Sequence, residues 1–101
     1  MILTVFRSRL KPENAETYQR VAAKMSELAQ SMPGYVSHKT FTADDGERVT
    51  IVEFESEAAQ RAWAQQPEHL GAQRLGRRDF YSEFRIQVCD VLRSTYFSAG
   101  A

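Results

Sequence analysis

Two histidines are the side chains of this sequence best suited to proton transfer near neutral pH. His69 follows Pro67 in a predicted break between helical segments, and loops commonly place reactive groups on a rigid scaffold. Because imidazole titrates at about pH 6.5, it can take a proton without extreme tuning of its pKa. His69 could equally brace the second predicted helix. His38 lies in the middle of a predicted strand, where we expect it to be solvated or hydrogen-bonded across a hairpin.

Aromatic and cationic side chains supply the other candidates for a site. Trp63 is the only tryptophan and lies on the inner stripe of the second predicted helix, so core packing is its more common role and a cavity wall the alternative. Arg77 could bind an anion, although the nearby Asp79 makes a solvated ion pair the commoner arrangement. Tyr81 precedes the last predicted strand, and a phenol in a pocket can donate a hydrogen bond to a developing oxyanion.

The sequence contains none of the short motifs that define the common enzyme classes. It has no glycine-rich phosphate loop, no GxSxG, no HExxH and no CxxC, so nucleotide binding and motif-defined hydrolysis have no support. His38 and His69 are far apart and have no cysteine near them, so we predict no metal site. Lys plus Arg and Asp plus Glu both number 13, and this zero net charge disfavours nucleic acid as a partner.

Signals for export or membrane insertion are also missing from the sequence. No apolar run approaches the roughly 18 residues of a membrane helix. Apolar residues 1–6 have no basic segment before them, so we interpret them as a first strand and not as a signal peptide. The single cysteine, Cys89, cannot form an intrachain disulfide, and its apolar neighbours predict a buried, inert thiol. These features favour a cytoplasmic protein.

The elements that must position these residues follow from hydrophobic periodicity. At 101 residues the chain has room for one domain. Period-two runs predict strands over residues 2–10, 35–43, 48–55 and 84–93, the middle two joined by a turn at Asp45-Gly46. Apolar spacings of three and four predict a helix over residues 15–32. A second helix, capped by Ser56, breaks at Pro67 and resumes over residues 68–75.

The resulting order, β-α-β-β-α-β, predicts a ferredoxin-like α+β fold with a four-stranded antiparallel sheet. Two right-handed crossovers place both helices on one face of that sheet and leave the other face open. The strands are apolar on both sides: in the first strand, Ile2 and Phe6 point one way and Leu3 and Val5 the other. Because soluble monomers avoid a large exposed apolar face, we predict a homodimer that packs sheet on sheet.

A series of short motifs, in order along nearly the whole chain, indicates a known family. The motifs are Lys11-Pro12-Glu13, Met32-Pro33-Gly34-Tyr35, Phe41-Thr42-Ala43-Asp44-Asp45-Gly46-Glu47, Phe54-Glu55-Ser56-Glu57, Ala62-Trp63, Pro67-Glu68-His69, Ala72-Gln73, Gly76-Arg77, Tyr81 and Ile86-Gln87-Val88-Cys89. With them the sequence resembles the antibiotic biosynthesis monooxygenase family. The resemblance implies one domain over residues 1–101, with a core of about 1–93 and a tail of 94–101, that pairs into a dimeric α+β barrel.

The resemblance also implies an activity. The family includes cofactor-independent monooxygenases that oxidise quinol or anthrone-type aromatics with O2, haem-degrading enzymes, and members of unknown role. We predict the first activity, on a small aromatic or quinol-like compound, with no cofactor and no metal. His69 would be the base, and Tyr81 and Arg77 would stabilise the substrate anion. The substrate wall would consist of Trp63, Phe54, Gln73 and Phe84.

Departures from the family patterns leave two other functions open. Where anthrone-type oxygenases carry Asn, Trp and Tyr around the substrate, this sequence has Thr50, Phe54 and Gln60. Where haem-degrading members carry an Asn and a His, it has Ser8 and Gln73, which disfavours haem. The alternatives are therefore a non-catalytic ligand-binding or stress-response barrel and, less favoured, a haem-binding or haem-degrading protein.

Overall fold

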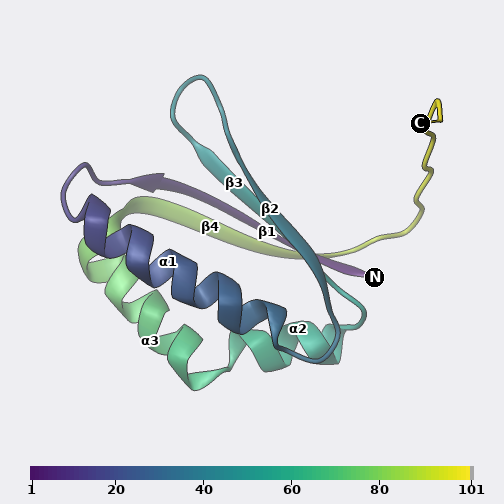
Figure 1. Cartoon of the computed structure of the whole chain (residues 1–101), viewed down its shortest axis with the longest axis horizontal. Coiled ribbons are helices and arrows are strands. Elements are labelled where there is room, and N and C mark those ends of the chain that lie inside the picture. Colours follow the sequence, from purple (N-terminus) through teal and green to yellow (C-terminus); the bar gives the residue numbers. More distant parts are fainter. Residues whose placement is uncertain (101) are drawn as a thin grey trace.

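The computed structural model describes residues 1–100, and Ala101, the last residue of the predicted tail, lies outside the described residues. Strands β1 (Ile2–Leu10), β2 (Tyr35–Thr42), β3 (Arg48–Phe54) and β4 (Tyr81–Asp90) form one antiparallel sheet in the order β2-β3-β1-β4. Helices α1 (Ala15–Gln30), α2 (Glu57–Ala64) and α3 (Pro67–Leu75) cover one face of it (Figure 1). The predicted ferredoxin-like α+β fold is confirmed.

The starts of α2 and α3 are set by local hydrogen bonds. The Ser56 hydroxyl accepts a hydrogen bond from the Ala59 amide at 3.1 Å, as its predicted capping role requires. Pro67 does not simply interrupt the helix but occupies the first turn of α3, where a missing N–H costs nothing. The side chain of Gln66 caps this second start by accepting from the His69 amide at 2.8 Å.

The last strand begins and ends three residues earlier than the predicted 84–93. Its partner, β1, explains both shifts. A bulge between Arg9 and Leu10 lets Leu10 pair with Tyr81, so pairing starts directly after a turn of π-helix over Gly76–Phe80 that the sequence pattern did not predict. At the other end Asp90 pairs with Ile2, the first residue of β1, and only one more backbone hydrogen bond follows, from the Val91 amide to the Met1 carbonyl at 3.1 Å.

The prediction of a buried Cys89 is wrong, because this residue is exposed. Cys89 pairs with Leu3, on the face of the sheet that no helix covers. An apolar sequence neighbourhood predicts burial only where something packs on that face. We call this surface the open face and define it by its apolar members, Leu3, Val5, Phe41, Val49 and Ile51.

Beyond β4 the chain leaves the body of the molecule. Residues 91–100 run away from the sheet in an extended conformation (Figure 1). This segment carries three large apolar side chains, Leu92, Tyr96 and Phe97, which are 81%, 88% and 85% exposed. Such exposure is high for apolar side chains of this size.

The main core fills one end of the space between sheet and helices. Phe54, at the end of β3, is fully buried and packs with Trp63 of α2 and Ala29 of α1. Gly34, with φ of 83°, lets the chain pass close to α2, since a Cβ there would lie 2.5 Å from the Cβ of Ala59. No helix within residues 1–100 is long and apolar enough to cross a membrane.

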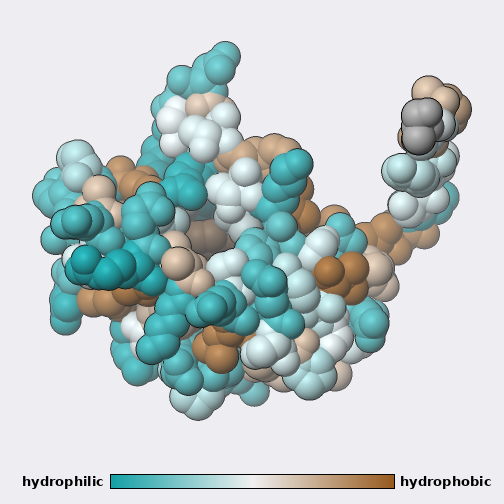
Figure 2. Space-filling view, in the orientation of Figure 1, coloured by the Kyte–Doolittle hydropathy of each residue, from teal (hydrophilic) through white to brown (hydrophobic). Residues whose placement is uncertain are grey.

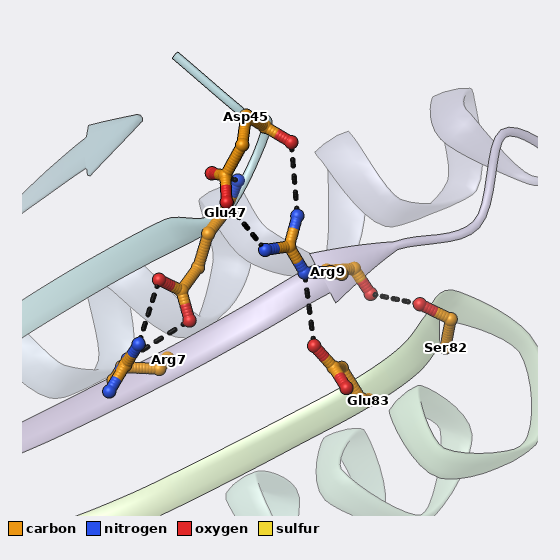
Figure 3. Close-up of polar contacts among 6 residues, drawn as sticks. All are labelled: Arg7, Arg9, Asp45, Glu47, Ser82 and Glu83. Carbon is orange, nitrogen blue, oxygen red and sulfur yellow. Dashed lines mark hydrogen bonds and ion pairs between the residues drawn. The ribbon is translucent and has the colours of Figure 1, made fainter. Parts of the chain in front are cut away.

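Ion pairs on the open face connect β1 to its neighbours (Figure 3). Arg7 makes two hydrogen bonds to Glu47, at 2.9 and 3.0 Å, and these hold the pKa of that carboxyl below its usual range. Arg9 bridges Asp45 at 2.8 Å and Glu83 at 3.0 Å. Because both arginines project from β1, the pairs tie the β2–β3 turn and β4 to the centre of the sheet and support the register.

Candidate functional site

A cavity of about 360 Å³ lies between the sheet and the three helices. In Figure 2 it is visible as a hollow between α1 and the sheet, with a hydrophobic floor. Most of its wall is apolar or aromatic, as in the majority of small-molecule sites, and a cavity of this volume suits a small aromatic compound. The polar and titratable side chains in the lining are Thr4, Tyr18, Ser26, His38, Thr40, Arg48, Thr50, Gln60, His69, Gln73 and Tyr81.

His69 lies in the first turn of α3 and stacks on Trp63, with ring centroids 4.0 Å apart and planes at 11°. Its Nδ1 lies 2.9 Å from the backbone carbonyl oxygen of Trp63. A carbonyl oxygen only accepts, so this contact assigns the proton to Nδ1 and leaves a lone pair on Nε2. Burial lowers the pKa of His69, although the Trp63 carbonyl opposes the shift. The imidazole is therefore a neutral proton acceptor at neutral pH.

Tyr81 lies at the start of β4, within a cluster of aromatic rings. Its ring centroid is 5.5 Å from that of Phe6, 5.8 Å from that of Phe84 and 6.1 Å from that of Tyr18. Burial, together with the neighbouring Tyr18, raises the pKa of Tyr81 far above that of an ordinary phenol. The hydroxyl therefore keeps its proton at physiological pH and is available as a hydrogen-bond donor to an anion.

The predicted site residues fall into two groups. His69, Trp63, Tyr81, Gln73 and Phe84 line one cavity, although they come from α2, α3 and β4. Thr50 and Gln60, two of the departures from the family pattern that the sequence showed, line it as well.

The other two predicted residues lie elsewhere. Phe54 is enclosed in the core and does not line the cavity. Arg77 is exposed on the π-helical turn, with its guanidinium carbon 5.4 Å from the ring centroid of Phe84, behind the wall and outside the lining.

The sequence pattern did not place several residues that line the cavity, among them His38 and Arg48. His38 does not bond across the hairpin: its Nδ1 is 2.5 Å from the Tyr35 hydroxyl and its Nε2 is 3.0 Å from Ser26 Oγ on α1. Arg48, the first residue of β3, also lines the cavity, and its guanidinium carbon lies 5.4 Å from the Tyr18 ring centroid. Both residues lie on the helix-covered face, but strand alternation alone does not tell which side of a strand the helices cover.

Comparison with known proteins gives one family and one curated relative. The family model for "Antibiotic biosynthesis monooxygenase" matches residues 1–75. The uncharacterized protein YqjZ of Bacillus subtilis is 30% identical over 90 residues, which are 89% of this chain and 79% of that protein.

Solved structures share the fold at low sequence identity. Rv0793 from Mycobacterium tuberculosis superposes with a TM-score of 0.80 and 16% identity, over 94% of this chain and 98% of that one. SnoaB, a cofactor-independent oxygenase from Streptomyces nogalater, superposes with a TM-score of 0.76 and 21% identity, over 92% of this chain and 94% of that one. At these identities the likeness establishes a common fold.

Proposed function

The chain belongs to the antibiotic biosynthesis monooxygenase family, and from that premise we propose that its cavity is the active site of a cofactor-independent monooxygenase. The substrate in this proposal is a small aromatic or quinol-like compound and the oxidant is O2. Support comes from the described cavity, from the proton acceptor in its wall, and from SnoaB, a cofactor-independent oxygenase with the same fold.

One observation carries the proposal: His69 presents a neutral imidazole to an apolar cavity with its Nδ1 proton bound to the Trp63 carbonyl. Nε2 is then the free basic nitrogen, and stacking on Trp63 fixes the plane of the ring. A general base must be unprotonated at the working pH and held in a fixed orientation. Burial lowers the pKa of His69 and keeps it unprotonated, and the Trp63 contacts fix its orientation.

The chemistry requires the protein to make and hold a substrate anion. His69 Nε2 takes a proton from a phenolic O–H or an activated C–H, and the electron-rich anion then passes electrons to O2. For a substrate CH2 group, a C–O bond to oxygen forms, the second C–H and the O–O bond break, and the products are a carbonyl and water. One oxygen atom enters the product and the other leaves as water, so atoms and electrons balance without a further reductant.

Other cavity residues support this chemistry. The protonated Tyr81 hydroxyl can donate a hydrogen bond to the developing anion. Trp63 and Phe84 give a flat apolar wall for an aromatic ring, while Gln73 adds an amide. Exclusion of water by this wall strengthens the hydrogen bonds to the anion and protects reactive intermediates. Arg77, outside the lining, would act only through a shift of the π-helical turn, and Phe54 supports the wall from behind.

We further propose that the working molecule is a homodimer that packs through the open face. On β1 and β3, Val5 pairs directly with Ile51, and Leu3 and Val49 lie diagonally next to this pair, opposite Glu53 and Arg7 respectively; these four apolar side chains form the apolar strip of the open face. No helix covers this strip (Figure 1). The extended tail, with Leu92, Tyr96 and Phe97 exposed, gives each chain a second apolar surface for its partner. A dimer would cover both.

The decisive experiment is an oxygen-electrode assay of the purified chain against a panel of quinols and anthrone-like phenols, without haem or flavin. We expect O2 uptake in the wild type and a loss of roughly 10²–10⁴-fold in His69→Gln. His38→Gln is the matched comparison: it removes the cavity imidazole whose nitrogens both contact hydroxyls, and we expect less than a tenfold loss. Equal losses in the two variants would overturn the assignment of His69.

The same assay separates the competing functions. A neutral imidazole whose other nitrogen is held by a carbonyl is also the usual form of a metal-binding histidine, so haemin is titrated in parallel. A shift of the haemin Soret band that is lost in His69→Gln, with no O2 uptake from phenols, would favour a haem-binding or haem-degrading protein. No uptake and no shift would favour the non-catalytic ligand-binding barrel.

A further inference from the structure

Arg48 is the one cation in the cavity lining within residues 1–100. It is the first residue of β3 and shares the helix-covered side of the strand with Thr50 and Val52, which also line the cavity. The guanidinium carbon lies 5.4 Å from the ring centroid of Tyr18. Stacking of this kind fixes the plane of a guanidinium while leaving its N–H donors at the edge of that plane.

Arg48 has no anionic partner within the described chain. It makes no side-chain hydrogen bond and no ion pair with residues 1–100. Two acids close to it in sequence are already bound: Glu47 makes two hydrogen bonds to Arg7, and Asp45 is paired with Arg9 (Figure 3). Both pairs lie on the open face, across the sheet from the cavity. These two carboxylates are therefore bound by the β1 arginines and not by Arg48.

The cavity itself also lacks a counter-ion for Arg48. No Asp or Glu of the described residues lines it. A half-buried guanidinium in a mainly apolar wall loses hydration, and without an anion this loss is not compensated. A planar guanidinium facing a cavity is the arrangement that binds a carboxylate or a similar oxyanion with two parallel hydrogen bonds.

Two tyrosines of the cavity lining, Tyr18 and Tyr81, connect to Arg48 through ring contacts. Tyr18 contacts the guanidinium through its ring, and its ring centroid is 6.1 Å from that of Tyr81. Because burial keeps the Tyr81 phenol protonated, it can donate to an anion and cannot compete as one.

We infer that the cavity takes an aromatic compound that carries a carboxylate or an equivalent oxyanion, and that Arg48 binds this anionic group. The inference rests on the proposed function insofar as the cavity is the substrate site. It adds a substrate class, an aromatic acid. It also adds the orientation of that substrate: the anionic group lies at Arg48, and the ring extends over the apolar wall toward Trp63 and His69.

A matched pair of fluorescent probes tests the inference without any turnover. 1-Anilinonaphthalene-8-sulfonate and N-phenyl-1-naphthylamine share one aromatic framework, and only the first carries an oxyanion. Energy transfer from Trp63, the only tryptophan, measures binding of either probe to the chain, and the Arg48 variants assign that binding to the cavity. We expect the wild-type chain to bind the sulfonate at least tenfold more tightly than the neutral amine.

Variants of Arg48 test whether the preference for the sulfonate depends on its guanidinium. In Arg48→Gln we expect the sulfonate to lose about tenfold or more in affinity while the neutral amine changes less than twofold, and Arg48→Lys to recover part of the preference. The matched control is Arg20→Gln, which removes an exposed arginine of α1 outside the cavity and leaves both affinities unchanged. Equal weakening of both probes, or an unchanged sulfonate affinity, would overturn the inference.

Failure of this inference and failure of the oxygenase proposal are distinguishable. Loss of sulfonate binding in Arg48→Gln together with no O2 uptake from any phenol would support the anion site and contradict the oxygenase proposal. Unchanged sulfonate binding together with O2 uptake that depends on His69 would support the oxygenase proposal and contradict the anion site.

Discussion

The imidazole of His69 lies flat on the indole of Trp63, and its Nδ1 is hydrogen-bonded to the backbone carbonyl of that same residue at 2.9 Å. The two residues are separated by the break between α2 and α3, and that break allows the chain to fold back. One residue thus fixes the plane of the ring through its side chain and the position of the proton through its backbone. The remaining nitrogen is a proton acceptor with a fixed direction.

The pH dependence of activity follows from the lowered pKa of His69. Burial disfavours the imidazolium, so the pKa lies below the ordinary 6.5 and the basic form persists into mildly acidic solution. We expect the acid limb of kcat/KM for O2 uptake to have its midpoint below pH 6.5. A midpoint above pH 6.5 would show that another group is the base.

The stability of the fold should depend on the same proton. In the unfolded chain His69 titrates near 6.5, whereas in the folded chain its pKa is lower, so below that pH the unfolded state binds a proton that the folded state does not. The free energy of unfolding should therefore fall as the pH decreases from about 6.5 toward the folded pKa. Urea unfolding of the wild type and of His69→Gln across pH 5–8 measures this dependence. The wild type's advantage in free energy of unfolding over the variant should shrink in acid. An advantage that stays constant with pH would contradict the linkage.

Trp63 has two roles that one substitution separates. Trp63→Phe keeps the backbone carbonyl, and therefore the His69 tautomer, but shortens the aromatic wall. We expect ligand affinity or KM to weaken several-fold while the protein loses roughly 0.5–3 kcal/mol of stability and still folds. Calorimetric melting and KM measured on the same preparation make the comparison. A large loss of melting temperature with an unchanged KM would assign Trp63 to the core alone.

The sequence was sufficient to predict the order of elements and several members of the cavity. Hydrophobic periodicity predicts the strands and helices, and the residue types of His69, Trp63 and Tyr81 mark them as candidates for a site. Arg48 and His38 did not stand out, because a single polar residue on a strand has the same pattern whether it faces solvent or a cavity. Their positions depend on which face the helices cover and on the hairpin register, which are tertiary facts.

The end of the chain shows a second limit of sequence reasoning. The shift of β4 arises from a bulge in β1 and a π-helical turn, neither of which has a strong composition signal. The exposure of Cys89 depends on which surfaces are covered, and periodicity carries no such information.

Gly76 allows Tyr81 to reach the cavity. A Cβ on Gly76 would lie 2.7 Å from the Tyr81 ring, which the surrounding aromatic cluster keeps from moving freely. Gly76→Ala should therefore destabilise the fold by about 1–3 kcal/mol and weaken O2 uptake through displacement of the phenol. Gly71→Ala in α3 is the matched control, since its nearest neighbour would be an arginine tip 3.9 Å away, and it should stabilise by about 0.4–1 kcal/mol. Equal changes in the free energy of unfolding of the two variants, measured in urea, would contradict the steric explanation.

The open face and the tail predict the state of assembly. Size-exclusion chromatography with light scattering at micromolar concentration should give twice the 11.5 kDa mass of one chain. Ile51 lies at the centre of the apolar strip, so Ile51→Glu places an unpaired charge in the proposed interface and should weaken dimerisation about 100-fold or more. Ala23→Glu adds the same charge on the exposed side of α1 and should leave the dimer intact.

A chain that ends at Arg93 measures the contribution of the tail. Removing Tyr96 and Phe97 leaves the sheet and the cavity untouched, because both side chains project from the extended segment beyond β4. We expect the shortened chain to dissociate at a higher concentration than the full chain while its melting temperature in the monomeric state is unchanged. The tail would be unrelated to assembly if the shortened chain dimerised as tightly as the full one. A monomeric full-length chain at micromolar concentration would remove the dimer itself, since the open face would then be stable in water without a partner.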